Sequence, residues 1–310
     1  MPFTSTFLLK ITLMPEMTLP ALRETDTPEC RQPPPIFGQT ALSGDWLEAY
    51  HRIDAAFLAL ARRLNAAEYQ FPSFIHASEL RKMDYLHSFP QHATFPQVLR
   101  QSDDNLQQFR GGELINADDE IQLTAMAPPK AILTPAACYH FYINFQRQNF
   151  AKTRLFTTRN NCFRHEKEYV PLERQWSFTM REIVCIGGED EVQAYVQETT
   201  LRLSGLFTRL NMDIQWQAAQ DPFFDPGNNP KHLLQKLHPN KHEMVFDNRL
   251  AVGSANYHRS YFGEIFNIKY SNTYAHSACI AFGIERWLAA FAARFGDNPP
   301  AWPLEQLEAI

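Results

Sequence analysis

Residues 159–188, RNNCFRHEKEYVPLERQWSFTMREIVCIGG, decide the fold of this chain because they predict two strands joined by a polar loop. The alternation at residues 163–166 places Arg164 and Glu166 on one face of the first strand. Polar and proline residues at 167–174 break this pattern and predict a hairpin loop. In the return strand, Glu182 shares its face with a run of apolar residues. A carboxylate there needs a cation or strong donors, so Glu182 is a candidate functional residue.

This hairpin resembles motif 2 of the class II aminoacyl-tRNA synthetases, which has an Arg-x-Glu strand, a loop and a return strand with a phenylalanine. The resemblance implies that Arg164 holds the α-phosphate of ATP and that Glu166 reads the adenine amino group. It also implies that Phe178 stacks on the adenine ring. An ordinary amphipathic hairpin with a surface Arg–Glu pair is the alternative that these residues leave open.

Composition indicates an ordinary soluble, globular protein. The chain has 310 residues, of which 45% are hydrophobic and 20% charged. That length suits one large domain or two small ones. The formal net charge of −5 argues against binding duplex DNA or tRNA by charge alone. No apolar run approaches the ~20 residues that span a bilayer, so we expect no membrane association.

The cysteines indicate a reduced, intracellular protein. Cys30, Cys138, Cys162, Cys185 and Cys279 have no regular spacing and form no CxxC pair. Free thiols in the cytoplasm are therefore expected. The first residues have no clear cleavage site, which argues against a signal peptide.

The N-terminal part predicts an irregular arm followed by one catalytic domain. Residues 1–42 are rich in proline, and we expect residues 43–310 to form the domain. Ser43 suits a helix N-cap, and apolar residues from Trp46 to Leu64 recur at spacings of three and four. The short apolar segment that ends at Pro72 predicts an edge strand. This helix and strand resemble motif 1 of the class II synthetases, which implies a homodimer that forms through residues 45–72.

The C-terminal part predicts a strand over residues 276–282 and a following helix that ends at Gly296. Between them, Gly283-Ile284-Glu285-Arg286 resembles motif 3 of the same synthetases. The resemblance implies that Arg286 binds the γ-phosphate, and a helix N-terminus suits an anion. The three motifs stand in family order over residues 45–295. We therefore expect an α+β fold with an antiparallel class II synthetase sheet flanked by helices.

Three segments between the motifs give weaker patterns. Thr134 and Pro135 suit the N-cap and first position of a helix, which would put Cys138 in its first turn. A second long helix is expected over residues 191–211. Residues 91–130 indicate mixed strands and loops.

Cys138, Glu182 and Cys279 are a sensible zinc-binding set, since thiolates and carboxylates both bind zinc. Their spacing in the sequence would not identify the site. However, residues 45–310 resemble the bacterial amino acid:carrier protein ligases, truncated relatives of the atypical archaeal seryl-tRNA synthetases. The segments that carry the resemblance are FPSFIHASELRKMDYLHSFP, CFRHE, RQWSFTMREIVCIG and HSACIAFGIERW. It implies that these three residues hold a zinc ion, which captures the α-amino group of a small amino acid such as glycine or alanine. We interpret Cys162 and Cys185 as structural.

The resemblance also implies the reaction: ATP, with Mg²⁺, activates the amino acid as an adenylate, and the aminoacyl group passes to the phosphopantetheine thiol of a carrier protein. Lys241 and Ser254 are further candidate ATP contacts. We expect no tRNA partner, because no long tRNA-binding module precedes the first helix and little chain follows residue 296. A tRNA-charging seryl-type relative and a non-catalytic paralogue that acts as a binding module are the alternatives.

A basic segment is a candidate docking surface for an acidic carrier protein. It contains Lys231, His232, Lys236, His238 and Lys241. A solvated face is the alternative for such a cluster.

Overall fold

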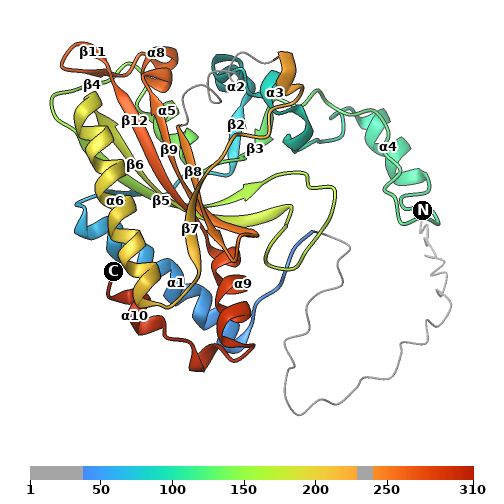
Figure 1. Cartoon of the computed structure of the whole chain (residues 1–310). Helices are drawn as coiled ribbons and strands as arrows, with labels where there is room; N and C mark the ends of the chain where they lie inside the picture. The colour runs from blue at the N-terminus through green and yellow to red at the C-terminus, as the bar shows by residue number, and fades with distance from the viewer. Residues whose placement is uncertain (1–37, 229–239) are drawn as a thin grey trace, which may run out of the picture. The chain divides into compact units, whose positions relative to one another are not determined.

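The computed structural model describes residues 38–228 and 240–310. A seven-stranded sheet forms its centre (Figure 1). The strand order is β1 (Ala67–Tyr69), β5 (Arg154–Phe163), β6 (Ser177–Gly187), β12 (His276–Gly283), β9 (Leu250–Arg259), β8 (Lys241–Phe246) and β7 (Ile214–Ala218). Strand β1 at the edge runs parallel to β5, and the other neighbouring pairs are antiparallel. The expected α+β fold with a largely antiparallel sheet is confirmed.

Three long helices cover one face of this sheet: α1 (Gly44–Arg63), α6 (Glu189–Arg209) and α9 (Ile284–Phe295). Each has an apolar stripe at helical spacing, and the stripes meet the inward residues of the central strands. Phe57 of α1 stacks on Phe282 of β12 with ring centroids 3.9 Å apart. Trp287 of α9 packs edge-on against Phe57. Short helix α10 (Leu304–Glu308) closes the same side against α1 and α6.

The opposite face of the sheet is covered over only part of its length. Helices α5 (Tyr139–Asn144) and α8 (Tyr261–Phe266) pack there through Tyr142 and Phe262, whose rings stack 3.9 Å apart. A small sheet contains β11 (Thr273–Tyr274), β10 (Lys269–Tyr270) and β4 (Asn149–Phe150). In the sequence, β4 follows α5, and β10 and β11 follow α8. The uncovered part of this face becomes the wall of a pocket.

The remaining elements lie between the first helix and β4. They are the two-stranded sheet β2 (Phe74–His76) and β3 (Ala131–Leu133), helices α2 (Ala77–Met83), α3 (Tyr85–Ser88) and α4 (Asp103–Gly111), and the turn η2 (Pro90–His92). Further 3₁₀ turns are η3 (Pro226–Asn228) and η4 (Pro299–Ala301). No helix among the described residues is both long and apolar enough to cross a membrane.

Several local expectations were wrong. Residues 91–130 contain helix α4 rather than strands, with Ser102 at its N-cap and two aspartates in its first turn. The expected second long helix is confirmed as α6, Glu189–Arg209, although it begins and ends two residues earlier than predicted. Strand β5 ends at Phe163, so Arg164 and Glu166 follow the strand instead of sharing its face. The backbone N–H of Arg164 still donates to Trp176 O at 3.0 Å. This bond joins the two segments of the hairpin just beyond the end of β5.

The helix expected from Thr134 begins only at Tyr139, with Cys138 as its N-cap residue. The backbone before it is used elsewhere. Pro135 O accepts a hydrogen bond from Arg164 Nε, and Ala137 N–H donates to Glu182. These long-range bonds replace the intrahelical ones that a longer helix would need.

Candidate active site

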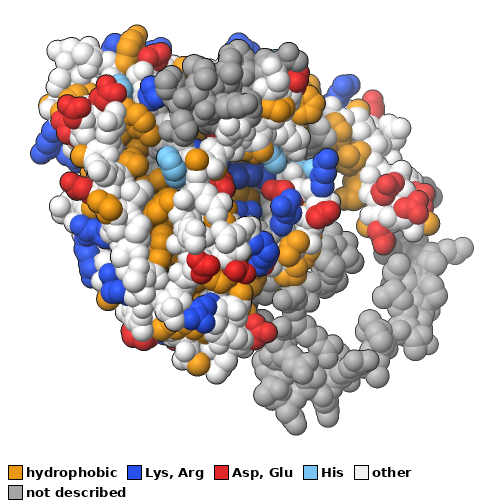
Figure 2. Space-filling model, viewed as in Figure 1, with side chains coloured by type: hydrophobic (Ala, Val, Ile, Leu, Met, Phe, Trp, Pro, Cys, Tyr) orange, Lys and Arg blue, Asp and Glu red, His pale blue; other side chains and the backbone are white. Residues whose placement is uncertain are grey.

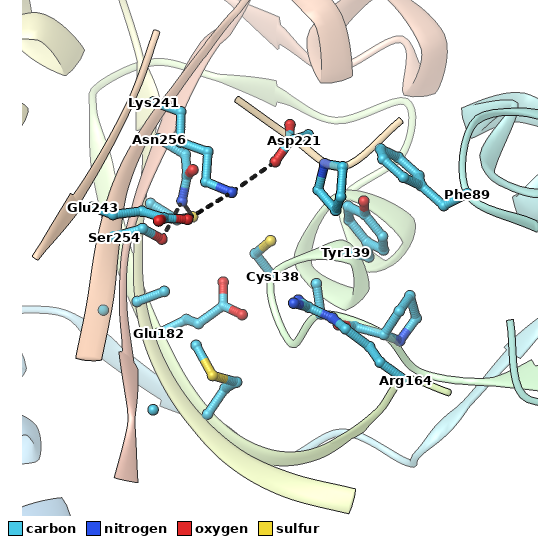
Figure 3. A pocket seen from close by; sticks show the side chains of 18 of the residues that line it. Phe89, Cys138, Tyr139, Arg164, Glu182, Asp221, Lys241, Glu243, Ser254 and Asn256 are labelled. Atoms are coloured by element: carbon cyan, nitrogen blue, oxygen red, sulfur yellow. Dashed lines mark hydrogen bonds and ion pairs between the residues drawn. The ribbon is translucent and has the colours of Figure 1, made fainter. Parts of the chain in front are cut away.

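A pocket of about 580 Å³ lies on the open face of the sheet. In the space-filling view, basic and acidic side chains gather around a hollow near the centre of the face shown (Figure 2). The residues predicted to bind ATP, the amino acid or zinc all line this pocket: Cys138, Arg164, Glu166, Phe178, Glu182, Lys241, Ser254, Cys279 and Arg286. Figure 3 shows several of them pointing into the same space. They come from segments far apart in the chain, and the sheet brings them together.

Two arginines converge at one part of the pocket. Arg164 donates from Nε to Pro135 O at 3.0 Å, and its guanidinium lies over the Phe178 ring at 5.3 Å from the centroid. Arg286 donates from Nε to Glu173 O at 2.7 Å. Burial, followed by the charge of nearby Arg164, lowers the pKa of Arg286. Two cations in a partly buried space favour an anionic ligand.

The hairpin loop (residues 164–176) between β5 and β6 carries Glu166. Its side chain forms an ion pair with Arg174 at 3.7 Å. Its backbone carbonyl accepts a hydrogen bond from Trp176 Nε1 at 2.8 Å. Glu173 pairs with Arg249 through both carboxylate oxygens. These contacts join the two ends of the loop to each other and join the loop to Arg249, which precedes β9.

Lys241 and Ser254 lie on neighbouring strands β8 and β9. Lys241 Nζ contacts Asp221 at 2.9 Å and Glu243 at 3.2 Å. Ser254 Oγ accepts a hydrogen bond from Asn256 Nδ2 at 3.0 Å. Lys231, His232, Lys236 and His238 of the predicted docking segment lie outside the described residues.

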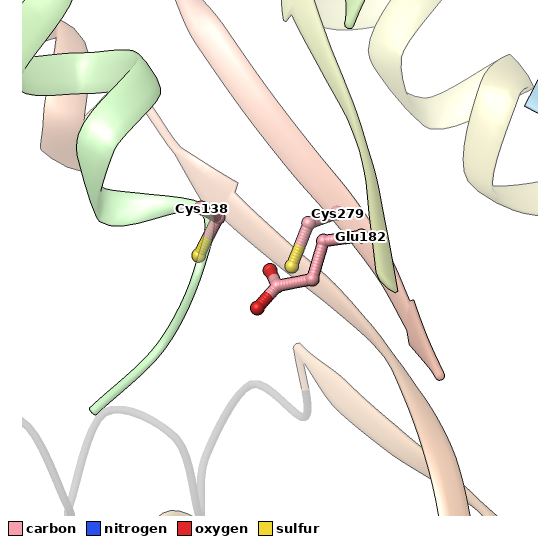
Figure 4. A group of neighbouring side chains, drawn as sticks. All are labelled: Cys138, Glu182 and Cys279. Atoms are coloured by element: carbon pink, nitrogen blue, oxygen red, sulfur yellow. The ribbon is translucent and has the colours of Figure 1, made fainter. Parts of the chain in front are cut away.

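Cys138, Glu182 and Cys279 form a buried cluster (Figure 4). Their donor atoms all lie within 4.8 Å of one another, and the residues are 5%, 3% and 2% exposed. Glu182 and Cys279 come from adjacent strands β6 and β12, while Cys138 stands at the start of α5. Glu182 Oε1 accepts a hydrogen bond from Ala137 N–H at 2.9 Å. This contact presents the carboxylate to both sulfurs.

The electrostatics of the cluster suit a cation. Burial, aided by the neighbouring Cys279 sulfur, raises the pKa of Glu182 to about 8. The hydrogen bond between the two cysteines raises the pKa of Cys138 and lowers that of Cys279. A buried group of potential anions is costly without a positive partner. For zinc bonds of about 2.0–2.3 Å, donors lie roughly 3.3–3.8 Å apart, so small movements would complete the ligand set.

Cys162 and Cys185 lie outside this cluster, and both side chains are fully buried. Burial raises the pKa of both thiols, that of Cys185 to about 12. Neither lines the pocket. Their location agrees with the structural role expected for them.

Asn256 and His258 are pocket residues that the sequence interpretation missed. Asn256 Nδ2 donates to Cys279 Sγ at 3.4 Å, and His258 Nε2 lies 3.9 Å from the same sulfur. The other ring nitrogen of His258 contacts Tyr142 Oη at 3.1 Å and Ser277 Oγ at 3.4 Å. Ser254, Asn256 and His258 alternate along β9, and this period-two run of polar residues was the signal available in the sequence.

Glu285 is a further missed residue of the pocket wall. Both its carboxylate oxygens accept the Thr179 N–H, at 3.0 and 2.9 Å. Because Thr179 follows Phe178 in β6 and Glu285 precedes Arg286 in α9, this contact couples the strand of one predicted motif to the helix of another. Burial raises the pKa of Glu285.

Comparison with known proteins decides the family. Amino acid–acyl-carrier-protein ligase 1 of Bradyrhizobium diazoefficiens is 31% identical over 285 residues, which are 86% of this chain and 82% of the relative. The chain belongs to this family. Ligase 2 of the same organism is also 31% identical, over 87% of the chain and 81% of that protein. No protein-family model matches the chain.

More distant similarity extends to tRNA ligases. The type-2 serine–tRNA ligase of Methanococcus maripaludis is 27% identical over 249 residues, or 75% of this chain and 48% of that enzyme. Among solved structures, M. kandleri SerRS in complex with A. aeolicus tRNASec has a TM-score of 0.72 at 19% identity, over 88% of this chain and 57% of that one. The cytoplasmic serine–tRNA ligase of Naegleria fowleri, in complex with AMP, has a TM-score of 0.63 at 14% identity, over 88% of this chain and 55% of that one. The fold is thus that of the class II synthetases.

Proposed function

We propose that this ligase joins a small amino acid, such as glycine or alanine, to the phosphopantetheine thiol of a carrier protein in two steps. In the first, a carboxylate oxygen of the amino acid attacks the α-phosphorus of ATP, and pyrophosphate leaves. In the second, the carrier thiol attacks the adenylate carbonyl, AMP leaves, and a thioester forms. The thiol proton passes to solvent.

One observation carries the proposal. The arginine and phenylalanine group and the Cys138–Glu182–Cys279 cluster face a single pocket. An amino acid held at the cluster would therefore have its carboxylate near a nucleotide held by Arg164 and Arg286. Placing two reactants in this way is a large part of what catalysis of adenylation requires. No side-chain nucleophile is needed.

The cluster would hold zinc, since two thiolates and a carboxylate match that metal. A zinc ion with three protein ligands offers an open position that can take an amino group. Small side chains beside the cluster support the preference for a small amino acid. Ser277 and Ala281 share the face of β12 that carries Cys279, and Tyr142 and Phe262 close the space beside His258.

Arg164 and Arg286 would neutralise the phosphates, with Mg²⁺ as the usual companion of ATP. Phe178 offers an aromatic face for the adenine, and Glu166 in the hairpin loop after β5 would accept a hydrogen bond from its amino group. Lys241 would break its ion pairs with Asp221 and Glu243 and contact a phosphate instead. Ser254 is a neutral donor on the same wall.

The proposal is tested by amino-acid-dependent exchange between ATP and pyrophosphate over a panel of amino acids. Exchange with glycine or alanine, and little with larger amino acids, is expected. A second assay offers the adenylate to a phosphopantetheinylated carrier protein and, separately, to the same carrier without its prosthetic group. Thioester should form on the first alone. Absence of exchange with every amino acid would reject the enzyme and favour a binding module.

A tRNA-charging activity is the second candidate, favoured by the similarity to type-2 serine–tRNA ligases. The higher identity and the greater shared length with the carrier-protein ligases support the carrier instead. Aminoacylation assays with total tRNA and with carrier protein separate the two. A homodimer that forms through residues 45–72, a cytoplasmic location and docking through the basic segment stay predictions. Light scattering of the purified protein tests the first of these.

A further inference from the structure

Residues 38–42, which precede α1, lie against the hairpin loop. We call them the N-terminal strap. Trp176 N–H donates to Gly38 O at 2.7 Å, and Leu172 N–H donates to Thr40 Oγ1 at 3.3 Å. The Tyr169 hydroxyl contacts Thr40 Oγ1 at 2.8 Å and also donates to Gln39 O. Both arms of the loop are therefore bonded to the strap.

Trp176 connects the strap to the ATP residues of the proposed function. Its indole Nε1–H donates to Glu166 O at 2.8 Å, and its carbonyl accepts the Arg164 N–H at 3.0 Å. Its own N–H is bonded to Gly38. One residue thus links the strap to the backbone of both Arg164 and Glu166. Trp176 as a whole is still 40% exposed, and the His165 ring packs beside the indole with ring centroids 5.3 Å apart.

Gly38 is suited to this contact in two ways. Its φ of +61° lies in the left-handed region that favours glycine. A Cβ at this position would lie 2.4 Å from the Trp176 ring. Because that atom would meet the root of a ring and not a flexible chain end, any larger residue must push the strap or the indole away.

The inner side of the loop is held by different contacts. Glu173 accepts from Arg286 through its carbonyl and pairs with Arg249 through its carboxylate. These bonds fix the part of the loop nearest the predicted γ-phosphate position. The strap bonds fix the part that carries Glu166. Losing the strap should therefore affect recognition of the adenine and the α-phosphate more than recognition of the γ-phosphate.

We propose that the N-terminal strap is a positioning element for the adenine end of the pocket, acting through Trp176 on Glu166 and Arg164. The inference rests on the proposed ATP-dependent function. A loop held on one side only would sample more conformations, and hydrogen bonding to the base would weaken.

The test compares Gly38→Ala with Gly44→Ala in the full chain. Gly44 also has a positive φ, +52°, but a Cβ there meets nothing within 4 Å. Both variants carry similar backbone strain, so their difference isolates the contact with Trp176. In ATP–pyrophosphate exchange, Gly38→Ala should raise the KM for ATP about tenfold and reduce the preference for ATP over GTP by a similar factor. The KM for the amino acid and the metal content should equal those of Gly44→Ala.

Two milder variants decide the matter if Gly38→Ala does not fold. Trp176→Phe removes the indole donor to Glu166 O and keeps the ring packed on Gly38. Thr40→Val removes the hydroxyl that bonds Leu172 and Tyr169 at nearly constant volume. Each should shift the ATP-to-GTP preference in the same direction, by several-fold. Preferences equal to wild type in both variants would overturn the inference.

Glu166→Gln separates this inference from the proposed function. If Glu166→Gln leaves the base preference unchanged, Glu166 does not read the adenine, and the proposed role of that residue fails. If Glu166→Gln changes the preference while Gly38→Ala, Trp176→Phe and Thr40→Val do not, the ATP site stands and the strap has no positioning role.

Discussion

Ala137 donates its backbone N–H to Oε1 of Glu182 at 2.9 Å, across 45 positions of sequence. The bond holds the loop before α5 against β6, and the next residue in that loop is Cys138. Glu182 in turn lies on the strand beside the one that carries Cys279. A single backbone contact thus completes the cluster of two thiols and one carboxylate. The sheet supplies two members, and the loop supplies the third.

Zinc should be present at roughly one atom per chain and should be lost in Cys138→Ala or Cys279→Ala, because each removes a thiolate ligand. Elemental analysis of the purified protein measures it. Cys185→Ala is the matched control, since it deletes an equally buried thiol that does not line the pocket. A wild-type protein without zinc, or zinc retained in both ligand variants, would contradict the assignment.

Asn256 should strengthen metal binding through its hydrogen bond to Cys279 Sγ. Hydrogen-bond partners of metal ligands commonly contribute about 10- to 100-fold in metal affinity, so Asn256→Ala should release zinc to a chelator at correspondingly lower concentration. Ser254→Ala is the control, because it removes the other partner of the Asn256 amide and leaves the sulfur contact intact. Equal zinc affinity in the two variants would show that the contact is incidental.

The return strand of the hairpin was well predicted, since strict alternation leaves few other arrangements. Phe178, Met180 and Glu182 do share the pocket face. The start of α5 was not well predicted, although Thr134 and Pro135 match the residues preferred at the N-cap and first position of a helix. Long-range bonds from Arg164 and Glu182 use that backbone, and tertiary contacts of this kind override local propensity.

The period-two spacing puts His258 on the face of Asn256, but its contact with Cys279 could not have been predicted from the sequence. Its approach to Cys279 depends on the register between β9 and β12, which shifts between Ser277 and Ala278. A bulge of this kind re-aims side chains and has no dependable local signature. The strap was missed in the same way, because residues 38–42 carry no periodic pattern and are fixed by contacts to a loop more than 120 residues away.

Arg286→Ala should slow adenylate formation and leave zinc content unchanged. Loss of one oriented charge at a phosphate commonly raises the barrier by on the order of 2–4 kcal/mol, or roughly 30- to 1,000-fold in kcat/KM. Exchange kinetics measure the effect. Arg249→Ala is a matched control, since Arg249 contacts the same residue, Glu173, from an exposed position. Arg249→Ala should change the barrier by no more than the ~0–1 kcal/mol that exposed ion pairs typically contribute to stability. Similar kinetics in both variants would refute the phosphate role of Arg286.

The buried ion pair between Asp54 of α1 and Arg181 of β6 should make the protein sensitive to the loss of either charge alone. Arg181 Nε donates to Asp54 Oδ1 at 2.6 Å and a second guanidinium nitrogen donates to Oδ2 at 2.9 Å, and both residues are buried. Among the described residues, removing Asp54 leaves the buried Arg181 charge with only the more exposed Glu68, at 3.4 Å, as an ion-pair partner. Asp54→Ala should therefore lower the free energy of unfolding by about 3–5 kcal/mol. Denaturant titration measures this, with Arg52→Ala as the control.

Arg52 pairs with Glu308 at the surface, and its loss should lower stability by only ~0–1 kcal/mol. The double variant Asp54→Leu with Arg181→Met distinguishes charge from packing. Because it removes both charges and keeps apolar volume, it should recover most of the stability lost in Asp54→Ala. If the double variant is as unstable as the single one, the helix is held by the shape of these side chains and not by the balance of their charges. If Asp54→Ala behaves like Arg52→Ala, α1 depends on its apolar stripe alone.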